Sequence, residues 1–241
     1  MRGGTGNDTY YVDNAADLIV ETISPTNKSA AGGIDTVIST ISFTLGNNIE
    51  NLKLDGAANL NATGNAADNV INGNSGDNII NCKEGVDSMD GMAGSDFYLI
   101  GSADEHSGAE IKDSGTAGTD EIRFSPVAPV ASTTGAAAIA PKLSLFAEDT
   151  GIERVVIGTG IGKMANTTGK IAADVDASAA QNQLTIIGNN GSNQLTGTGF
   201  DDTLVGNGGN DVLTGGLGAD KFVDRKSTRL NSSHVSESRM P

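Results

Sequence analysis

Aspartate and asparagine recur at every ninth residue of a glycine-rich stretch near the end of the chain. The stretch consists of four nonapeptides, GNNGSNQLT (188–196), GTGFDDTLV (197–205), GNGGNDVLT (206–214) and GGLGADKFV (215–223). Counted from the leading glycine, position six holds Asn193, Asp202, Asp211 and Asp220. Carboxylate and amide oxygens in a flexible turn suit calcium, whereas zinc would require His or Cys and magnesium a tighter octahedron. The spacing therefore indicates a row of calcium ligands.

A second block with the same period lies earlier in the chain. It runs GNAADNVIN (64–72), GNSGDNIIN (73–81), CKEGVDSMD (82–90) and GMAGSDFYL (91–99), and its position six holds Asn69, Asn78, Asp87 and Asp96. A further copy, GGTGNDTYY (3–11), carries Asp8 in the same place. A fixed short period of this kind indicates a solenoid, in which each repeat is one structural unit.

The nonapeptide also defines the elements that must position these side chains. Glycines at positions one, two and four allow a sharp turn whose carbonyl groups converge. In the second block the turn glycines include Gly206, Gly209, Gly215, Gly216 and Gly218 at these positions, together with Gly208 at position three. The last three residues predict a short strand with one inward apolar side chain at position eight. If two nonapeptides make one coil, turns eighteen residues apart stack, and an ion can bridge each stacked pair. The predicted pairs are Asp202 with Asp220, Asn193 with Asp211, Asn69 with Asp87, and Asn78 with Asp96.

Departures from the pattern rank the candidate sites. Asparagine replaces the carboxylate in three turns, and Cys82 replaces a glycine. Fewer anionic ligands predict weaker calcium binding in the first block, so the best site is expected between Asp202 and Asp220, followed by the site of Asp211. For any single Asp, an ordinary turn residue that caps its own backbone is the alternative.

Segments rich in Ile, Val and Thr at period two flank both blocks and predict strands. They are 34–45, 49–56, 120–124, 153–158 and 183–188. Gly33-Ile34-Asp35 is echoed by Gly118-Thr119-Asp120, and Ile49-Glu50 by Ile152-Glu153. The chain therefore reads as two modules, each a strand-rich segment followed by four nonapeptides. A charge-poor stretch at 126–141 is expected to be a loop.

Composition limits the classes of partner. The formal net charge is −15 and aromatic residues make up 4% of the chain, so nucleic acid is an improbable partner and the core is expected to be thin. No apolar run is long enough to span a membrane. The single cysteine excludes an internal disulfide.

The two ends of the sequence are expected to be unnatural. The start enters a repeat almost at once, which suggests truncation. The tail resembles a translated sequencing adapter, with DRKSTRLNSSH at its head. The expected division is an end of a preceding repeat (1–11), a strand-rich lead-in (12–63), repeat block 1 (64–99), a strand-rich spacer (100–187), repeat block 2 (188–223) and an artefactual tail (224–241).

Motifs for catalysis are missing. The chain has no HExxH or GxSxG sequence, and neither GTGIGKM (158–164) nor DVDAS (174–178) has the residues that a phosphate loop or an EF-hand needs. His106 is expected to be a surface residue without function. The segment is therefore predicted to be non-catalytic.

The nonapeptides GGLGADKFV, GNGGNDVLT and GGTGNDTYY resemble the RTX, or haemolysin-type, calcium-binding repeats. The resemblance implies an all-β, right-handed parallel β-roll or β-helix solenoid that is disordered without Ca²⁺ and folds in the calcium-rich exterior. It further implies export by type I secretion machinery, a secreted or cell-surface location and a monomeric segment of a larger chain.

Two alternatives remain for the parent protein. The first is a secreted enzyme, such as a protease, lipase or polysaccharide-modifying protein, with this segment as its non-catalytic tail. The second is a structural adhesin or surface-layer solenoid. The missing upstream sequence would discriminate between them.

Overall fold

The computed structural model describes residues 1–21, 33–102, 105–106, 108, 110–126 and 140–224. The described residues contain eighteen strands in three sheets and no α-helix. The five-stranded sheet has the order β1 (Thr9–Val12), β2 (Thr36–Ser39), β4 (Asn51–Leu54), β6 (Val70–Asn72) and β8 (Ser88–Asp90). The nine-stranded sheet has the order β18 (Lys221–Asp224), β16 (Thr203–Asn207), β14 (Thr185–Ile187), β12 (Arg154–Ile157), β10 (Glu121–Phe124), β9 (Phe97–Ile100), β7 (Ile79–Asn81), β5 (Asn61–Thr63) and β3 (Phe43–Thr44). The four-stranded sheet has the order β11 (Lys142–Ser144), β13 (Asp174–Asp176), β15 (Gln194–Thr196) and β17 (Val212–Thr214).

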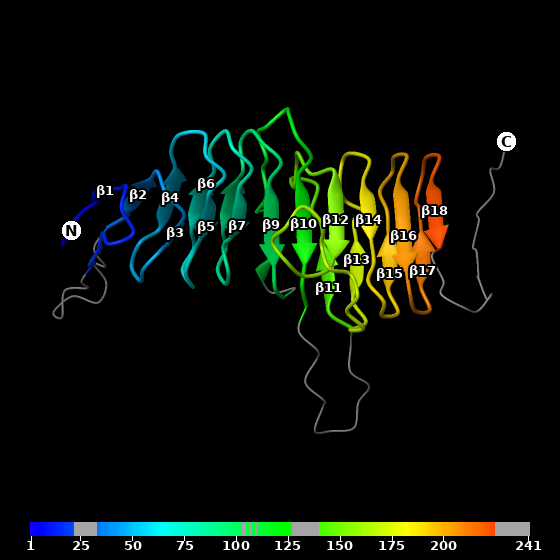
Figure 1. Ribbon diagram of the computed structural model, residues 1–241. Helices are drawn as coiled ribbons and strands as arrows, with labels where there is room; N and C mark the ends of the chain where they lie inside the picture. The colour runs from blue at the N-terminus through cyan, green and yellow to red at the C-terminus, as the bar shows by residue number, and fades with distance from the viewer. Residues whose placement is uncertain (22–32, 103–104, 107, 109, 127–139, 225–241) are drawn as a thin grey trace, which may run out of the picture.

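Every pairing between these strands is parallel. From β2 to β9, and again from β10 to β18, consecutive strands alternate between the nine-stranded sheet and one of the two shorter sheets. Each pair of strands thus forms one coil, and the coils stack in a row from β1 to β18 (Figure 1). Within the repeat blocks the register step is eighteen residues, as in Val70↔Ser88 and Thr203↔Lys221. The predicted all-β parallel roll is confirmed, and its right-handed sense stays a prediction.

The core is built of columns of inward side chains, in which each strand contributes a residue to the column of its sheet. In the five-stranded sheet the register aligns Tyr10, Val37, Leu52, Ile71 and Met89. In the nine-stranded sheet it aligns Ala62, Ile80, Tyr98, Ile122, Val155, Ile186, Leu204 and Phe222. All of these side chains are buried except Phe222 in β18, which is 37% exposed. Period-two strands place alternate side chains on opposite faces, which explains why one residue per nonapeptide suffices for the core.

The segments outside the repeats continue the same columns. All five predicted spacer strands are present, as β2 with β3, β4, β10, β12 and β14. Among the described residues, however, no strand ladder connects β8 to β11, and the isolated bridges Met89↔Ile111 and Lys112↔Thr150 link β8 through 111–112 to the segment between β11 and β12. The predicted loop at 126–141 lies outside the described residues apart from its ends, and so does the tail beyond Asp224.

Candidate metal centres

The position-six side chain closes its own turn by accepting a hydrogen bond from the backbone N–H four residues earlier. Asn69 Oδ1 accepts from Asn65 N at 2.8 Å, Asn78 Oδ1 from Asn74 N at 2.8 Å, and Asn193 Oδ1 from Asn189 N at 2.9 Å. In the turn of Asp202, Oδ2 accepts from Thr198 N at 2.6 Å. The side chain therefore lies inside the turn, pointing toward the coil rather than toward solvent.

The glycine at position one makes room for that side chain. A Cβ atom at Gly197 would stand 2.5 Å from Asp202 Oδ2, and one at Gly206 would stand 2.5 Å from Asp211 Oδ2. A Cβ at Gly215 would collide with Asp220 in the same way. The left-handed backbone falls elsewhere in the turn, with φ of 114° at Gly209, 105° at Gly216 and 106° at Gly218. Gly208 faces Asn190 instead, with 2.9 Å between its Cβ position and Asn190 Oδ1.

Each position-six residue also contacts its counterpart eighteen residues later. The backbone N–H of Asn69 donates to Asp87 Oδ1 at 2.8 Å, and that of Asn78 donates to Asp96 Oδ1 at 2.6 Å. In the second block, Asn193 N donates to Asp211 Oδ1 at 2.9 Å, and Asp202 N to Asp220 Oδ1 at 3.0 Å. The four pairs named from the sequence are thus stacked neighbours along the roll.

Asparagine and aspartate differ in the second polar atom of the position-six side chain, which is an NH₂ group in Asn and an oxygen in Asp. The amide of Asn193 donates to Ala173 O at 2.7 Å, and that of Asn78 donates to Leu60 O at 3.2 Å. Asn69 donates to Ile49 O and Glu50 O, both at 3.3 Å. In these turns the NH₂ group supplies the positive partner that the carbonyl oxygens need.

Aspartate cannot donate in this way, because an ionised carboxylate only accepts. Oδ2 of Asp8, Asp87 and Asp96 is buried without a hydrogen-bond partner. A buried, unpaired anionic oxygen is costly unless a cation neutralises it. The first block therefore holds candidate ligands in Asp87 and Asp96, although its Asn residues satisfy their own turns.

Burial perturbs these acids strongly. Desolvation raises the pKa of Asp87 to about 7, against the opposing effect of the hydrogen bond from Asn69 N, and Glu110 and Asp68 add repulsion. Desolvation likewise raises the pKa of Asp96 to about 8, partly offset by the hydrogen bond from Asn78 N. A bound divalent ion would reverse this effect, since opposite charge favours the ionised carboxylate.

In the pair expected to form the best site, Asp202 has more hydrogen-bond donors than Asp87 or Asp96 has. Asp202 accepts from Leu184 N at 2.7 Å through Oδ1 and from Thr198 N through Oδ2, so both its oxygens have donors. Asp220 accepts from Asp202 N. The capping role that the sequence left as an alternative is therefore real at Asp202, and a carboxylate with a second lone pair can cap and coordinate together.

Acids outside the nonapeptides extend the same stack, and the sequence did not single them out as ligands. Asp8 N donates to Asp35 Oδ1 at 2.8 Å, and Asp96 N donates to Asp120 Oδ1 at 2.7 Å. Asp35 N in turn donates to Glu50 Oε2, and Asp120 N to Glu153 Oε2, both at 2.8 Å. The signal that could have found them was the echo between the two modules.

The expectation that His106 lies on the surface is wrong. Its side chain is fully buried, with Nε2 2.9 Å from Asp149 Oδ2 and Nδ1 3.3 Å from Glu110 Oε2. Burial alone would lower the pKa of His106, but the bonds to Asp149 and Glu110 outweigh it and raise the pKa to about 9. The ring is therefore a cation at neutral pH, held between two carboxylates.

These observations define a class of protein, a parallel β-roll whose turns present stacked side-chain oxygens to cations. Residues 63–98 and 187–222 each match the RTX calcium-binding nonapeptide repeat family over four copies. The chain thus carries two blocks of RTX repeats, and Ca²⁺ is the cofactor of these repeats. The family is a metal-binding one and not a catalytic one.

One relative is similar over a short stretch. The chain is 38% identical over 71 residues to the endo-1,3-1,4-β-glycanase ExsH of Rhizobium meliloti (strain 1021), which is 30% of this chain and 14% of that protein. The chain therefore spans only a small part of that relative. No solved structure matches the chain. The described residues include no helix of the length and apolarity needed to cross a membrane.

Proposed function

We propose that this chain is a calcium-dependent folding segment of a secreted protein, ordered by Ca²⁺ outside the cell. The observation that carries the proposal is the set of buried Asp oxygens in the repeat turns that have no hydrogen-bond partner. Without a cation these groups oppose folding, and the net charge of −15 adds general repulsion. With a cation, the binding free energy becomes folding free energy.

The proposed ligands are the position-six side chains and the turn carbonyls beside them. In the second block they are Asp202, Asp211 and Asp220, with Asn193 as a neutral member and the turn glycines 206, 208, 209, 215, 216 and 218 supplying backbone. In the first block they are Asp87 and Asp96 with Asn69 and Asn78, and Asp8 serves the opening repeat. Calcium, when bound, supplies the positive charge that these turns lack. Every other requirement, namely orientation, burial and stacking, is met by the chain itself.

The calcium affinity expected for such a module would make folding depend on the cellular compartment. Extracellular calcium modules typically bind at about 10⁻⁴ to 10⁻³ M. A segment in that range would stay unfolded in a low-calcium cytosol and order on export, in keeping with type I secretion. We also propose the division into lead-in, block 1, spacer and block 2 at the boundaries given above, because the repeat blocks alternate with spacer strands.

The test is circular dichroism of the chain during titration with Ca²⁺, with Mg²⁺ as the control ion. A triple variant, Asp202→Ala, Asp211→Ala and Asp220→Ala, is expected to lose the part of the calcium-induced β signal that comes from the second block. The matched control replaces three exposed acids that accept no side-chain hydrogen bond, Asp13→Ala, Asp55→Ala and Glu84→Ala. A β signal that is indifferent to calcium in all three proteins would refute coupled folding and favour a structural solenoid.

A second candidate function concerns the parent protein. The similarity to a stretch of a named endo-1,3-1,4-β-glycanase favours a polysaccharide-modifying enzyme over a protease, a lipase or an adhesin. In this proposal the present chain is the non-catalytic part. The complete coding sequence, expressed and assayed on a mixed-linkage β-glucan, should release reducing ends. An inactive product built of further arrays would support the adhesin alternative.

A further inference from the structure

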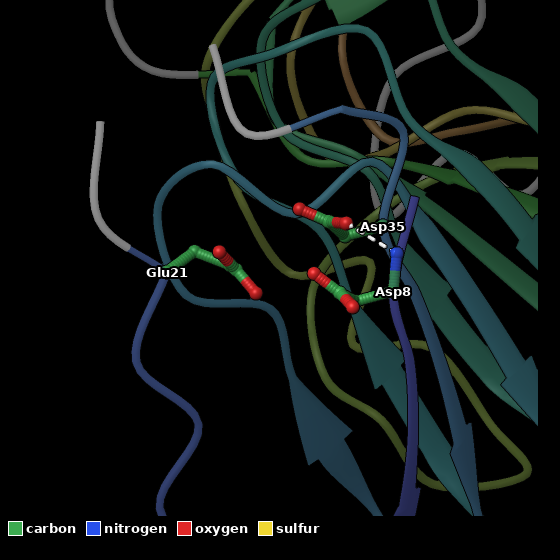
Figure 2. Close-up of side chains that lie close together, drawn as sticks. All are labelled: Asp8, Glu21 and Asp35. Atoms are coloured by element: carbon green, nitrogen blue, oxygen red, sulfur yellow. Dashed lines mark hydrogen bonds between the residues drawn. The ribbon is translucent and has the colours of Figure 1, made fainter. Parts of the chain in front are cut away.

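Three acids meet where the first repeat turn joins the strand-rich lead-in. Asp8 belongs to the opening nonapeptide, whereas Glu21 and Asp35 lie outside any repeat. Figure 2 shows their carboxylates facing a common space, and one oxygen from each lies within 4.8 Å of the others. Asp35 is fully buried. The residues that share this space come from three separate parts of the chain.

Asp35 and Glu21 are each held through one carboxylate oxygen, and all three acids have a second oxygen without a partner. Asp35 Oδ1 accepts from Asp8 N at 2.8 Å, and Glu21 Oε2 accepts from Gly4 N at 3.3 Å. Asp8 Oδ2, Glu21 Oε1 and Asp35 Oδ2 are buried and have no hydrogen-bond donor. No ion pair among the described residues involves any of the three. The carboxylates of the cluster are therefore held in place, but no positive group among the described residues neutralises their charge.

The free oxygens converge on one point beside the backbone of Gly3. The position that a Cβ atom would take there lies against Asp8 Oδ2, Glu21 Oε1 and the hydroxyl of Tyr10. That hydroxyl is also buried without a partner. Several oxygens around one small space, with no nitrogen or sulfur ligand among them, match the preference of calcium.

The same arrangement recurs at the junction after the first repeat block. Asp96, Asp113 and Asp120 form a second group within 4.8 Å, and all three are buried. Asp96 Oδ2 has no partner, and Asp120 accepts from Asp96 N as Asp35 does from Asp8 N. Tyr98 takes the place of Tyr10, with its hydroxyl donating to Asp113 Oδ2 at 2.6 Å. The two junctions thus each bring together a repeat aspartate, two spacer acids and a tyrosine hydroxyl.

We propose that a divalent cation of the size of Ca²⁺ binds between Asp8, Glu21 and Asp35, and a second between Asp96, Asp113 and Asp120. In each site, acids from the spacer complete the ligand set, so the ion fastens a repeat turn to the non-repeat strand that follows it. The inference rests on the proposed calcium binding and adds Glu21, Asp35, Asp113 and Asp120 to its ligands. The chain would then respond to calcium outside its repeat blocks as well.

Terbium luminescence can test the first site, because Tb³⁺ takes the place of Ca²⁺ at oxygen sites and emits when a nearby tyrosine is excited. The chain has three tyrosines and no tryptophan, so few residues can sensitise the ion. The variant is Glu21→Gln, and the matched control is Asp13→Asn, an exposed acid of the same segment. The full chain is titrated with Tb³⁺ and then with competing Ca²⁺.

We expect tyrosine-sensitised emission that Ca²⁺ displaces in the wild type and in Asp13→Asn. Glu21→Gln should weaken the tightest sensitised component by about tenfold or more, as loss of a group from a metal site does. A Tyr10→Phe variant keeps every carboxylate and should lose that emission while retaining calcium binding within a few-fold. Asp113→Asn should affect a separate component that Tyr98 sensitises.

Equal Tb³⁺ affinity in Glu21→Gln and Asp13→Asn would overturn the inference, and so would undiminished emission from Tyr10→Phe. The second result does not depend on whether Glu21→Gln folds. The proposed function fails differently, through calcium-indifferent circular dichroism of the wild type. If folding depends on calcium but Glu21→Gln titrates with Tb³⁺ as the wild type does, the proposal of calcium sites in the repeats is retained and only the proposal of junction sites is rejected.

Discussion

At the scale of single residues, the glycine that leads a nonapeptide is required because a Cβ atom there would collide with neighbouring atoms. Gly197 has no left-handed φ, yet a Cβ there would stand 2.5 Å from both Asp202 Oδ2 and Gly215 O. Gly216 and Gly218 are required for a different reason, since their φ angles are left-handed and disfavour any residue with a Cβ. Position one is therefore glycine so that the position-six oxygen can turn inward.

Replacement of Gly197 by Ala should accordingly destabilise the calcium-bound roll by about 1–3 kcal/mol, the usual cost of overpacking. The matched control is Gly199→Ala, two residues along the same turn, where a Cβ would meet nothing within 4 Å. Urea unfolding of both variants at saturating Ca²⁺ checks this. Equal stability of the two would contradict the steric account.

His106 acts as a resident cation in a place where the stack of acids continues. Its ring bridges Asp149 and Glu110, and Phe146 packs edge-on at a centroid distance of 5.6 Å. Asp149 also accepts from Ile111 N at 3.2 Å and from Phe146 N at 2.8 Å. The imidazolium therefore neutralises carboxylates that would otherwise need an ion.

The stabilisation by His106 should depend on pH. The folded pKa of about 9 exceeds the ordinary value of 6.5, so the contribution is complete below the unfolded value and is lost as pH rises through about 9. The gap in unfolding free energy between wild type and His106→Gln should shrink between pH 6 and pH 10 by on the order of 3 kcal/mol. Urea unfolding at fixed Ca²⁺ measures it. A gap that is constant with pH would mean that folding does not shift the pKa of the ring.

At the scale of the turn, the choice between Asn and Asp decides whether a coil depends on the ion. The amide of Asn193 donates to Ala173 O and to Asn189 Oδ1, so this turn is satisfied from within. A carboxylate in the same place would offer no donor and would leave Ala173 O unpaired by that side chain. Turns with Asn therefore bind calcium less tightly than turns with Asp, but their stability depends less on the ion.

Asn193→Asp should consequently lower the stability of the calcium-free chain by about 1–3 kcal/mol, the cost of a buried polar group left unsatisfied. The same variant should bind Ca²⁺ more tightly, because one ligand gains a negative charge. Asn210→Asp, an exposed change of the same kind in the repeat that stacks eighteen residues further on (206–214), is the control. Thermal unfolding with chelator and isothermal titration with Ca²⁺ measure the two effects. Tighter binding without loss of stability would show that the amide has no structural role.

Local periodicity predicted the roll well because each nonapeptide carries its own turn and strand signals. The pairing of Asn193 with Asp211, for example, follows from a step of eighteen residues alone. The burial of His106 could not be predicted in this way, since its partner Asp149 is 43 residues away. Glu21 and Asp35 escaped for a related reason. Spacer acids lack the nonapeptide period, so Asp35 could be found only through its echo at Asp120, and Glu21 only in the folded chain.

At the scale of the whole molecule, the roll is close to one-dimensional, because each coil contacts only its neighbours. The nine-stranded sheet runs unbroken from β3 to β18. In the described residues, by contrast, the five-stranded sheet ends at β8 and the four-stranded sheet begins at β11, and the region between them holds isolated bridges at Ile111 and Thr150 instead of a ladder. The joint near Ile111 and Thr150 is therefore the place where cooperation between the two modules is expected to be weakest.

Loss of calcium binding in the second block should thus remain local, since stability in such arrays is a sum of repeat and neighbour terms. In the triple variant at Asp202, Asp211 and Asp220, amide hydrogen exchange should become fast over 188–223 and stay slow over 43–100. Mass-spectrometric exchange at saturating Ca²⁺ resolves this. Uniformly fast exchange along the chain would indicate a single cooperative unit, and the exposed-acid triple variant supplies the baseline.

The asparagine-bearing turns also bear on the order in which the chain acquires its structure. Asn69 and Asn78 lie in the two halves of one coil, and both carry their own hydrogen-bond donors. Such a coil can form before any ion arrives and can then serve as a template on which neighbouring coils add. The coil of Asn69 and Asn78 would act as the folding nucleus, and the neighbouring aspartate turns would add to it once they bind calcium. Neutral amides at a few positions would in this way set the starting point and direction of assembly.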